Sequence, residues 1–250
     1  MNIVTVAKIV HDDQDIMVAA DRTLDHSKAR PTVSTYDLNA IEASSLAAKD
    51  QGATHTVVSV GTPYIDETKN NKNILARGVD SLTLVMSEGY SDLDSKATVE
   101  ALAGALKDMP ADLIVCGDGS ADIYAQQVDI QLAQALGLPV VTAVSKFSFE
   151  GGTLVAERML ETEKEVVEVA LPAVVSVVPD IALPRICGMR DIMQAGKKPV
   201  NKVEGADVSR GVEIVETLAP EPAPRKKIVF DASTDGDLDK FVAAIAEAVR

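Results

Sequence analysis

Residues 112–128 read D-L-I-V-C-G-D-G-S-A-D-I-Y-A-Q-Q-V. Residues 113–116 form a short apolar run of the kind found in buried β-strands. A turn with two glycines follows at residues 117–120, and a helical pattern begins near Asp122. In such a strand–turn–helix segment the unpaired N–H groups of the helix start can bind an anion, and the glycines permit close approach. An ordinary βα loop also uses glycine and aspartate, so this stretch alone leaves both readings open.

The segments before this stretch alternate between strand and helix patterns. We expect strands at residues 2–10, 55–60 and 81–86, and helices at residues 37–50 with Asp37 as N-cap, 67–77 and 93–107. A small hairpin is expected within residues 11–35. This alternation predicts an α/β fold with a mostly parallel, doubly wound, Rossmann-like sheet of the adenine-nucleotide-binding kind. Ligands of such sheets bind beyond the carboxyl ends of the strands. Residues 6–8, 60–61 and 117–128 are therefore expected around one crevice.

The pattern changes after Pro139. Four β runs at residues 140–149, 152–160, 165–171 and 173–178 predict a β-meander at about 140–180 that extends the sheet. We expect residues 1–200 to form the nucleotide-binding domain. Residues 201–250 form a charged, proline-bearing arm that ends in an amphipathic helix at 237–249. Because this arm is too polar to bury itself, we expect it to pack on a partner chain and not on its own sheet.

The composition excludes several classes of function. A formal net charge of −14 and the absence of tryptophan argue against binding to nucleic acid or to an anionic membrane surface. The 2 cysteines are far apart in sequence and the 3 histidines lack metal-ligand spacing, so no disulfide or metal site is expected. There is neither a G-x-G-x-x-G motif after the first strand nor a Walker P-loop, and no catalytic triad stands out. We expect a cytoplasmic protein with a nucleotide pocket and no catalytic residues of its own.

Several stretches resemble the β subunit of electron transfer flavoprotein. Residues 157–177, E-R-M-L-E-T-E-K-E-V-V-E-V-A-L-P-A-V-V-S-V, follow the family order of a V-E-R strand, an acidic turn, a Glu and L-P-A-V-V. Residues 184–199, P-R-I-C-G-M-R-D-I-M-Q-A-G-K-K-P, are similar to the family's P-R-x-x-x-L-x-x-I-M-x-A-x-K-K. The openings I-V-T-V-A-K and Y-D-L-N-A-I-E-A fit the same template, which covers about residues 1–205. Residues 116–128 are most similar to the Fix-type branch, which is linked with carnitine metabolism.

The resemblance implies an electron-carrier subunit in a heterodimer. Its α subunit would carry a redox-active FAD, and this chain would bind AMP or a second FAD. Electrons would pass to or from an acyl-CoA-type dehydrogenase or reductase, and some relatives bifurcate electrons. Carried over by position, the cofactor contacts fall on Val6, Ser34, Thr35, Tyr36, Asp37, Val60, Gly61, Gly117, Asp118, Gly119, Ser120, Asp122, Tyr124, Ala125, Gln126, Gln127 and Val128. Backbone N–H groups from Tyr124 to Val128 are expected to bind the phosphate.

Some residues depart from the family pattern. Ser34 stands where many members have Asn, and Met159 replaces a common Glu beside Arg158, so a tether to the α subunit could be missing. The pair Gln127-Val128 is more similar to bifurcating relatives than to the Gln-Thr of AMP-binding members. Together with Val60 before Gly61, it favours FAD over AMP.

The resemblance also implies a recognition loop at about residues 184–195 that docks the partner dehydrogenase. Its docking residues would be Arg185, Met189 and Arg190, with Met189 in place of the family's exposed leucine. Without the resemblance, a methionine here would be expected to pack inward. An alternative for the whole chain is a stand-alone adenine-nucleotide-binding regulator of universal-stress type, which would be shorter and would lack the meander and arm.

Overall fold

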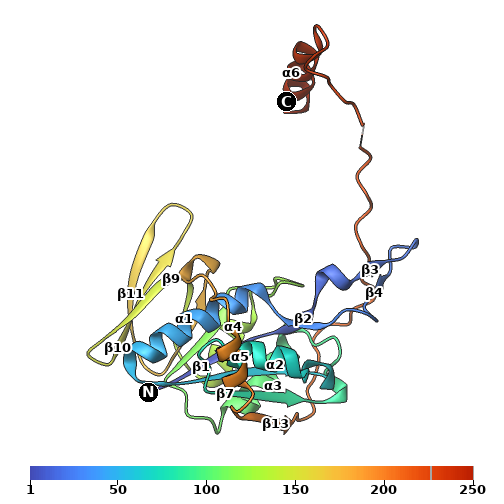
Figure 1. Ribbon diagram of the computed structural model, residues 1–250. Coiled ribbons are helices and arrows are strands. Elements are labelled where there is room, and N and C mark those ends of the chain that lie inside the picture. The colour runs from blue at the N-terminus through green and yellow to red at the C-terminus, as the bar shows by residue number, and fades with distance from the viewer. Residues whose placement is uncertain (226, 250) are drawn as a thin grey trace.

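The computed structural model describes residues 1–225 and 227–249 and is built on one large sheet (Figure 1). The nine strands lie in the order β11 (Lys164–Ala170), β10 (Thr153–Met159), β9 (Val140–Glu150), β12 (Ala173–Val177), β8 (Leu113–Gly117), β1 (Asn2–Val6), β6 (Thr54–Gly61), β7 (Ser81–Met86) and β13 (Val200–Glu204). All neighbours from β9 to β13 are parallel, whereas β9, β10 and β11 pair antiparallel. The predicted mostly parallel α/β fold is confirmed.

Helices cover both faces of the parallel strands. One face carries α1 (Thr35–Gln51), α2 (Thr68–Leu75) and α5 (Met189–Ala195), and the other carries α3 (Ser95–Leu106) and α4 (Val128–Leu136). Successive side chains of a strand point to opposite faces, so Val115 packs with α1 and Cys116 with α3 and α4. Because both faces are covered, β8 can be apolar throughout its length.

The first strand is shorter than expected. β1 ends at Val6, and after Ala7 and Lys8 the chain continues as β2 (Ile9–His11), which pairs with β5 (Pro31–Val33) in a separate small sheet. The expected hairpin is β3 (Met17–Val18) with β4 (Leu24–Asp25). Short 3-10 helices lie at Asp13–Asp15, Pro63–Ile65, Glu88–Tyr90 and Pro179–Ile181. Across the described part of the chain, every helix is too short or too polar to cross a membrane.

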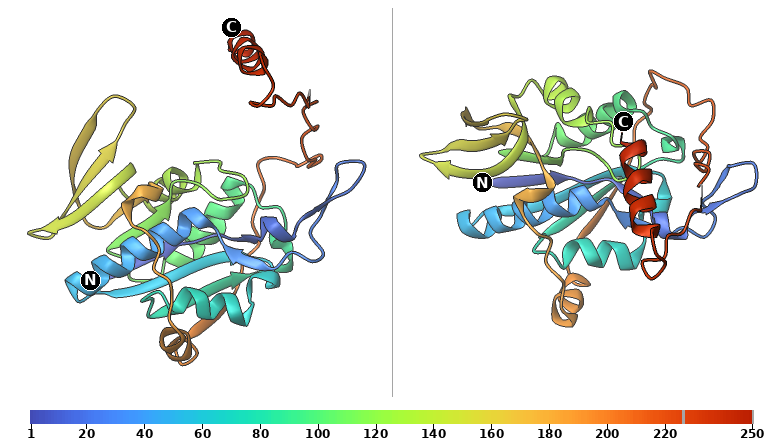
Figure 2. Two further views of the ribbon diagram at one scale, coloured as in Figure 1. Left: turned by 45° about the horizontal axis from the view of Figure 1, so that its top comes forward. Right: turned by 90° about the horizontal axis from the view of Figure 1, so that it is seen from above.

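The meander has three strands and not four. β9, β10 and β11 form consecutive hairpins that project from one end of the sheet (Figure 2). β12 instead returns into the parallel sheet between β9 and β8. Burial explains the difference: all five residues of β12 are buried, whereas β11 alternates between exposed and half-buried residues. The prediction of four antiparallel runs was wrong for this last run.

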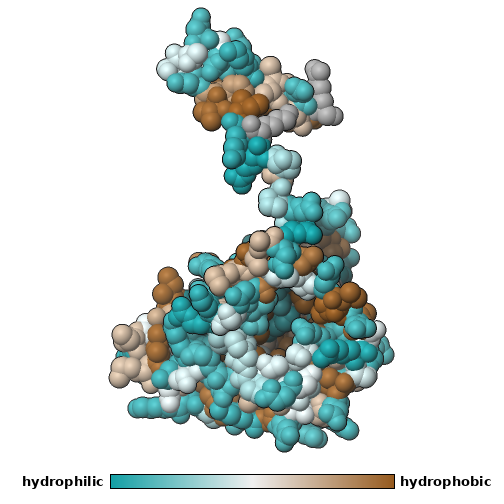
Figure 3. All heavy atoms as spheres, turned by 90° about the vertical axis from the view of Figure 1, so that its right-hand side faces the viewer, coloured by the Kyte–Doolittle hydropathy of each residue, from teal (hydrophilic) through white to brown (hydrophobic). Residues whose placement is uncertain are grey.

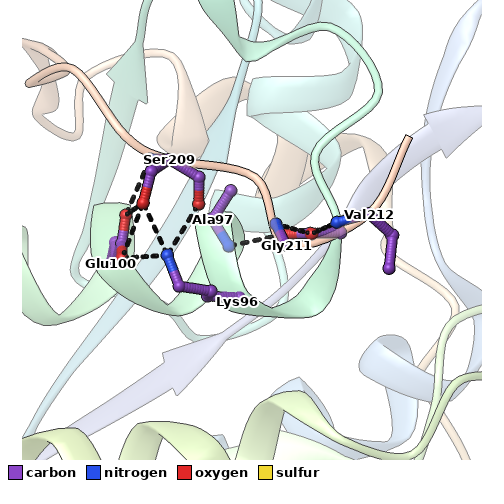
Figure 4. Close-up of polar contacts among 7 residues, drawn as sticks. Lys96, Ala97, Glu100, Ser209, Gly211 and Val212 are labelled. Atoms are coloured by element: carbon purple, nitrogen blue, oxygen red, sulfur yellow. Dashed lines mark hydrogen bonds and ion pairs between the residues drawn. The ribbon is translucent and has the colours of Figure 1, made fainter. Parts of the chain in front are cut away.

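The beginning of the arm belongs to the sheet. β13 pairs in parallel with β7, from Val200 opposite Leu82 to Glu204 opposite Met86, which contradicts the expectation that the chain leaves its own sheet at residue 200. The chain beyond β13 is then bound at the start of α3. The carboxylate of Asp94 accepts hydrogen bonds from the backbone of Ala97, Gly211 and Val212, and Lys96 and Glu100 both bind Ser209 (Figure 4). Further along, the N–H of Ala219 donates to the carbonyl of Arg22, and the carboxylate of Glu221 pairs with the guanidinium of Arg22.

The terminal helix lies away from the sheet. α6 (Asp237–Ala248) is connected to the body through an extended segment (Figures 1 and 2). Its Phe241 packs edge-on against Phe230, with 5.6 Å between ring centroids. The apolar side chains of the helix are between 44% and 64% exposed at Leu238, Phe241, Val242 and Ile245. The expected amphipathic helix is present, and its apolar face is open.

Candidate functional site

The strand order reverses between β1 and β8. From β1 the chain adds β6 and β7 on one side, and it then crosses to place β8 on the other side of β1. Loops that leave β1 and β8 in opposite directions open a crevice at the carboxyl edge of the sheet, where ligands of such folds bind. Viewed from this side, the molecule has a hollow in its surface (Figure 3).

Two of the three segments expected around the crevice, residues 6–8 and 117–128, meet there, together with the start of α1. Nζ of Lys8, just after β1, lies 2.7 Å from a carboxylate oxygen of Asp122, in the loop after β8. The N–H of Lys8 donates to Asp37 of α1 over 2.8 Å. The N–H of Ala121 donates to Oγ of Ser34 over 3.2 Å. Residues from three separate parts of the sequence are thus in contact at this edge of the sheet.

Asp37 is not the N-cap of its helix. α1 begins at Thr35, and Ser34 occupies the cap position without a side-chain capping bond. Asp37 is buried in the first turn. Burial raises the pKa of Asp37 to about 7, against the opposing effect of hydrogen bonds from the backbone of Lys8 and Gly117 and from the side chain of Ser34. A carboxyl group that is partly protonated near neutral pH therefore lies directly under the crevice.

The loop after β8 is longer than the sequence suggested. α4 begins at Val128 and not near Asp122. The N–H of Tyr124, one of the expected phosphate donors, instead donates to the carbonyl of Ser120 over 3.1 Å. Tyr124 and Gln126 have positive φ angles of 51° and 54°, which a right-handed α-helix excludes. Asp122 accepts hydrogen bonds from Ser120 and from the N–H of Ile123, so local side-chain bonds replace the helical turn.

The glycines of this loop make room for the chain's own side chains. A Cβ on Gly117 would lie 2.6 Å from a carboxylate oxygen of Asp37. A Cβ on Gly119 would collide with the ring of Tyr124. That ring lies 5.0 Å from the ring of Tyr36, and its hydroxyl donates to Asp118 over 2.8 Å. Both glycines are therefore needed by the fold of the loop, whatever ligand it binds.

Two groups of the crevice are suited to a ligand. Gln127 at the start of α4 makes no capping bond, because its side chain accepts from Ser95 over 2.7 Å instead. The first N–H groups of α4 therefore have no side-chain acceptor in their own helix. Oδ1 of Asp118 is buried and has no hydrogen-bond partner among the described residues. A donor on a ligand would satisfy this oxygen.

The remaining predicted contacts line the same edge with different exposure. Val6 is buried, Val60, Gly61 and Val128 are half-buried, and Thr35, Ala125 and Gln126 are exposed. A Cβ on Gly61 would lie 2.7 Å from Ile65, so this glycine also serves local packing.

Lys8 and His11 are the crevice residues that the sequence left outside the expected cofactor contacts. His11 stacks on Tyr64 with 4.5 Å between ring centroids and lies 4.7 Å from His26. Burial and the neighbouring His26 lower the pKa of His11, and Asp122 opposes them. The sequence placed Lys8 at the crevice, because residues 6–8 follow the first strand at the switch point, but it assigned Lys8 no contact with a ligand.

The predicted docking loop divides into a fixed part and an exposed part. Arg185 forms two hydrogen bonds to the carboxylate of Glu42, over 2.7 and 2.8 Å, so its guanidinium is committed to α1. Met189 is the first residue of α5 and is 77% exposed, and Ile186 is 98% exposed. Arg190 is exposed as well. The inward packing expected for an ordinary methionine is not observed at Met189.

Comparison with known families identifies this architecture. A family model described as the electron transfer flavoprotein domain matches residues 21–208, which include the crevice loop, the meander and β13. This match covers well over half of the chain. The chain therefore belongs to the electron transfer flavoprotein family, whose members are electron carriers.

Proposed function

We propose that this chain is the β subunit of an electron transfer flavoprotein of the Fix type. It binds an adenine-containing nucleotide in the crevice between β1 and β8. Its α subunit carries a second FAD, and the heterodimer passes electrons to or from an acyl-CoA-type dehydrogenase or reductase, with bifurcation where both flavins take part. The cytoplasm as its location stays a prediction.

The observation that supports a nucleotide most directly is the pair of unsatisfied groups in the crevice. The N–H groups at the start of α4 suit a phosphate, because they carry the positive end of the helix dipole. The buried Oδ1 of Asp118 suits a hydroxyl or amino group of a ribose or an adenine. Asp118 and the start of α4 lie at the two ends of the segment 118–128, and one ligand that bridges them would satisfy both groups. A bound flavin would supply the electron transfer, and AMP would serve as a structural ligand.

We favour FAD over AMP in this subunit. The motivation is Val128 after Gln127 and Val60 before Gly61, which give the crevice apolar side chains where AMP-binding members have other groups. Both valines are half-buried at the crevice edge. A flavin needs an open, apolar slot for its ring system, whereas AMP has no ring to place there beyond its adenine.

The open face of α6 supports a partner subunit. Four large apolar side chains on this 12-residue helix are exposed. The segment before the helix is polar and contains prolines. An amphipathic helix of this kind gains stability when its apolar face enters a groove on another chain. The arm contacts its own body up to residue 221, so the proposed contact with the α subunit is restricted to the chain beyond it. A universal-stress regulator would need neither this helix nor the meander.

The test is the flavin and AMP content of the complex formed when this chain is expressed with the α subunit encoded beside it. We expect a yellow heterodimer with two FAD and no AMP. One FAD and one AMP would contradict the preference for FAD, and a colourless single chain would contradict the function. A chain truncated after Pro224 should lose the α subunit but keep its own nucleotide, whereas a full yield of truncated heterodimer would contradict the role of α6.

A further inference from the structure

We propose that Asp122 is an internal anion that competes with the phosphate of the ligand for Lys8, and so sets how strongly the crevice discriminates between ligands with and without a phosphate. The proposal rests on the proposed function only in that a nucleotide binds in this crevice. It assigns to Asp122 a role opposite to that of a ligand-binding residue.

The geometry of the ion pair carries the proposal. Nζ of Lys8 and Oδ2 of Asp122 are 2.7 Å apart, and their side chains are 42% and 39% exposed. A carboxylate at this distance holds the ammonium in the way a phosphate oxygen would. Because both side chains reach solvent, the pair is weak enough for a ligand to open it.

The negative charges around the crevice mean that an anionic ligand needs the positive charge of Lys8 to bind there. Asp118 and Asp129 lie in the elements that form the crevice, and the whole chain has a formal net charge of −14. A phosphate that approaches this edge is repelled unless a cation compensates for it. Lys8 supplies that charge, and Asp122 neutralises it. His11 also faces Asp122, since the charge of Asp122 acts on the pKa of His11.

The loop holds Asp122 in place through bonds that do not involve Lys8. Oδ1 of Asp122 accepts from Oγ of Ser120 and from the N–H of Ile123, leaving Oδ2 for Lys8. An asparagine can keep the Oδ1 contacts with its amide oxygen, but it presents a neutral NH₂ group to Lys8. Asp122→Asn therefore removes the competing charge with little change to the shape of the loop.

The experiment measures the dissociation constants of AMP and adenosine for the full-length chain after any copurified nucleotide has been removed. For Asp122→Asn we expect AMP to bind about two- to fivefold more tightly, as for release from an exposed ion pair. Adenosine, which has no phosphate, should bind as it does to the original chain. The matched control is Glu88→Gln, an exposed acid after β7 that makes the same change of charge without touching Lys8.

A double-mutant cycle separates competition from a general effect of charge. Lys8→Gln should weaken AMP binding, and Asp122→Asn added to Lys8→Gln should bring no further gain. A gain of equal size in the presence and absence of Lys8, or an equal gain in Glu88→Gln, would overturn the proposal.

The remaining outcomes distinguish the two proposals. Weaker AMP binding by Asp122→Asn would make Asp122 a ligand-binding residue and would overturn the competition while leaving the nucleotide site intact. Unchanged AMP binding would also overturn the competition and would leave the nucleotide site intact. If the original chain and all variants fail to bind AMP, adenosine and FAD, then the nucleotide site itself is wrong, and the competition falls with it.

Discussion

Two ion pairs connect loops of this molecule to its body, and they differ in how far their side chains are buried. Arg185 holds the segment after β12 to Glu42 of α1, and Lys8 holds the segment after β8 through Asp122. The side chain of Glu42 is 6% exposed, whereas both partners of the second pair are about 40% exposed. Arg185 makes a two-pronged contact with Glu42, and Lys8 makes a single one with Asp122.

The difference indicates which loop is fixed and which can open. A buried carboxylate that loses its cation keeps a negative charge that neither water nor a counter-ion stabilises. Breaking the Arg185–Glu42 pair therefore costs much free energy. In an exposed pair, each charged group can be hydrated when the pair opens, so opening it costs little free energy. The recognition loop is therefore presented on a fixed base, and the crevice loop is held by a contact that a ligand can replace.

Replacing Glu42 with Gln should destabilise the fold by about 2 to 3 kcal/mol. This is below the usual loss for a fully buried pair, because Arg185 reaches solvent and keeps part of its hydration. The measurement is the free energy of unfolding in urea. The matched control is Glu157→Gln, which breaks the exposed hairpin pair with Lys164 and should cost less than about 1 kcal/mol. Equal losses in the two variants would contradict the expected difference in stability between a buried and an exposed pair.

Replacing Met189 with Ala should weaken docking of the proposed dehydrogenase by about 2 kcal/mol, or roughly thirtyfold in affinity. The reason is that the fixed Arg185 leaves Met189 and Ile186 exposed, and a flexible thioether fills imperfect pockets. Binding of the heterodimer to the dehydrogenase measures this effect. The flavin spectra and urea stability should not change, since an exposed side chain contributes little to the core; a loss of stability would place Met189 in the core instead.

The sequence predicted the parallel sheet because each central strand is a short apolar run separated from the next by a helix pattern. It also placed the crevice, because the carboxyl ends of β1 and β8 follow from that order. It did not predict the start of α4. The residues from Asp122 to Gln127 suit a helix locally, but Asp122 and Tyr124 bond to Ser120, Lys8 and Asp118 instead.

Long-range pairing explains the other misses. V-N-K-V-E at 200–204 reads as polar linker, and it becomes β13 because the edge of β7 offers a hydrogen-bonding partner more than 100 residues earlier in the chain. The Arg185–Glu42 contact joins residues 143 positions apart, and no local pattern marks such a pair. Sequence patterns report local periodicity, whereas these features depend on which segments the fold brings together.

Asp37 gives the last test, because it is buried like Glu42 but lies beside the releasable Lys8. Burial raises its pKa in the folded protein to about 7, from an ordinary value of 3.8. Between about pH 4 and pH 7 the folded protein therefore retains a proton that the unfolded chain has released. The free energy of unfolding should then fall as the pH rises through this range, by up to about 1.4 kcal/mol for each pH unit, and change little from this cause above it.

Urea unfolding of the original chain and of Asp37→Asn at a series of pH values measures this slope. Asparagine cannot titrate, so the contribution of Asp37 to the slope should vanish in the variant even if its absolute stability is lower. The same slope in both proteins would mean that Asp37 is ionised in the folded state and that Lys8 compensates for it. Lys8 would then serve two carboxylates at once, Asp37 below it and Asp122 beside it. A ligand phosphate that displaced Asp122 would then gain less binding free energy from Lys8. The Lys8–Asp122 pair would also be harder to open, and so more like the Arg185–Glu42 pair.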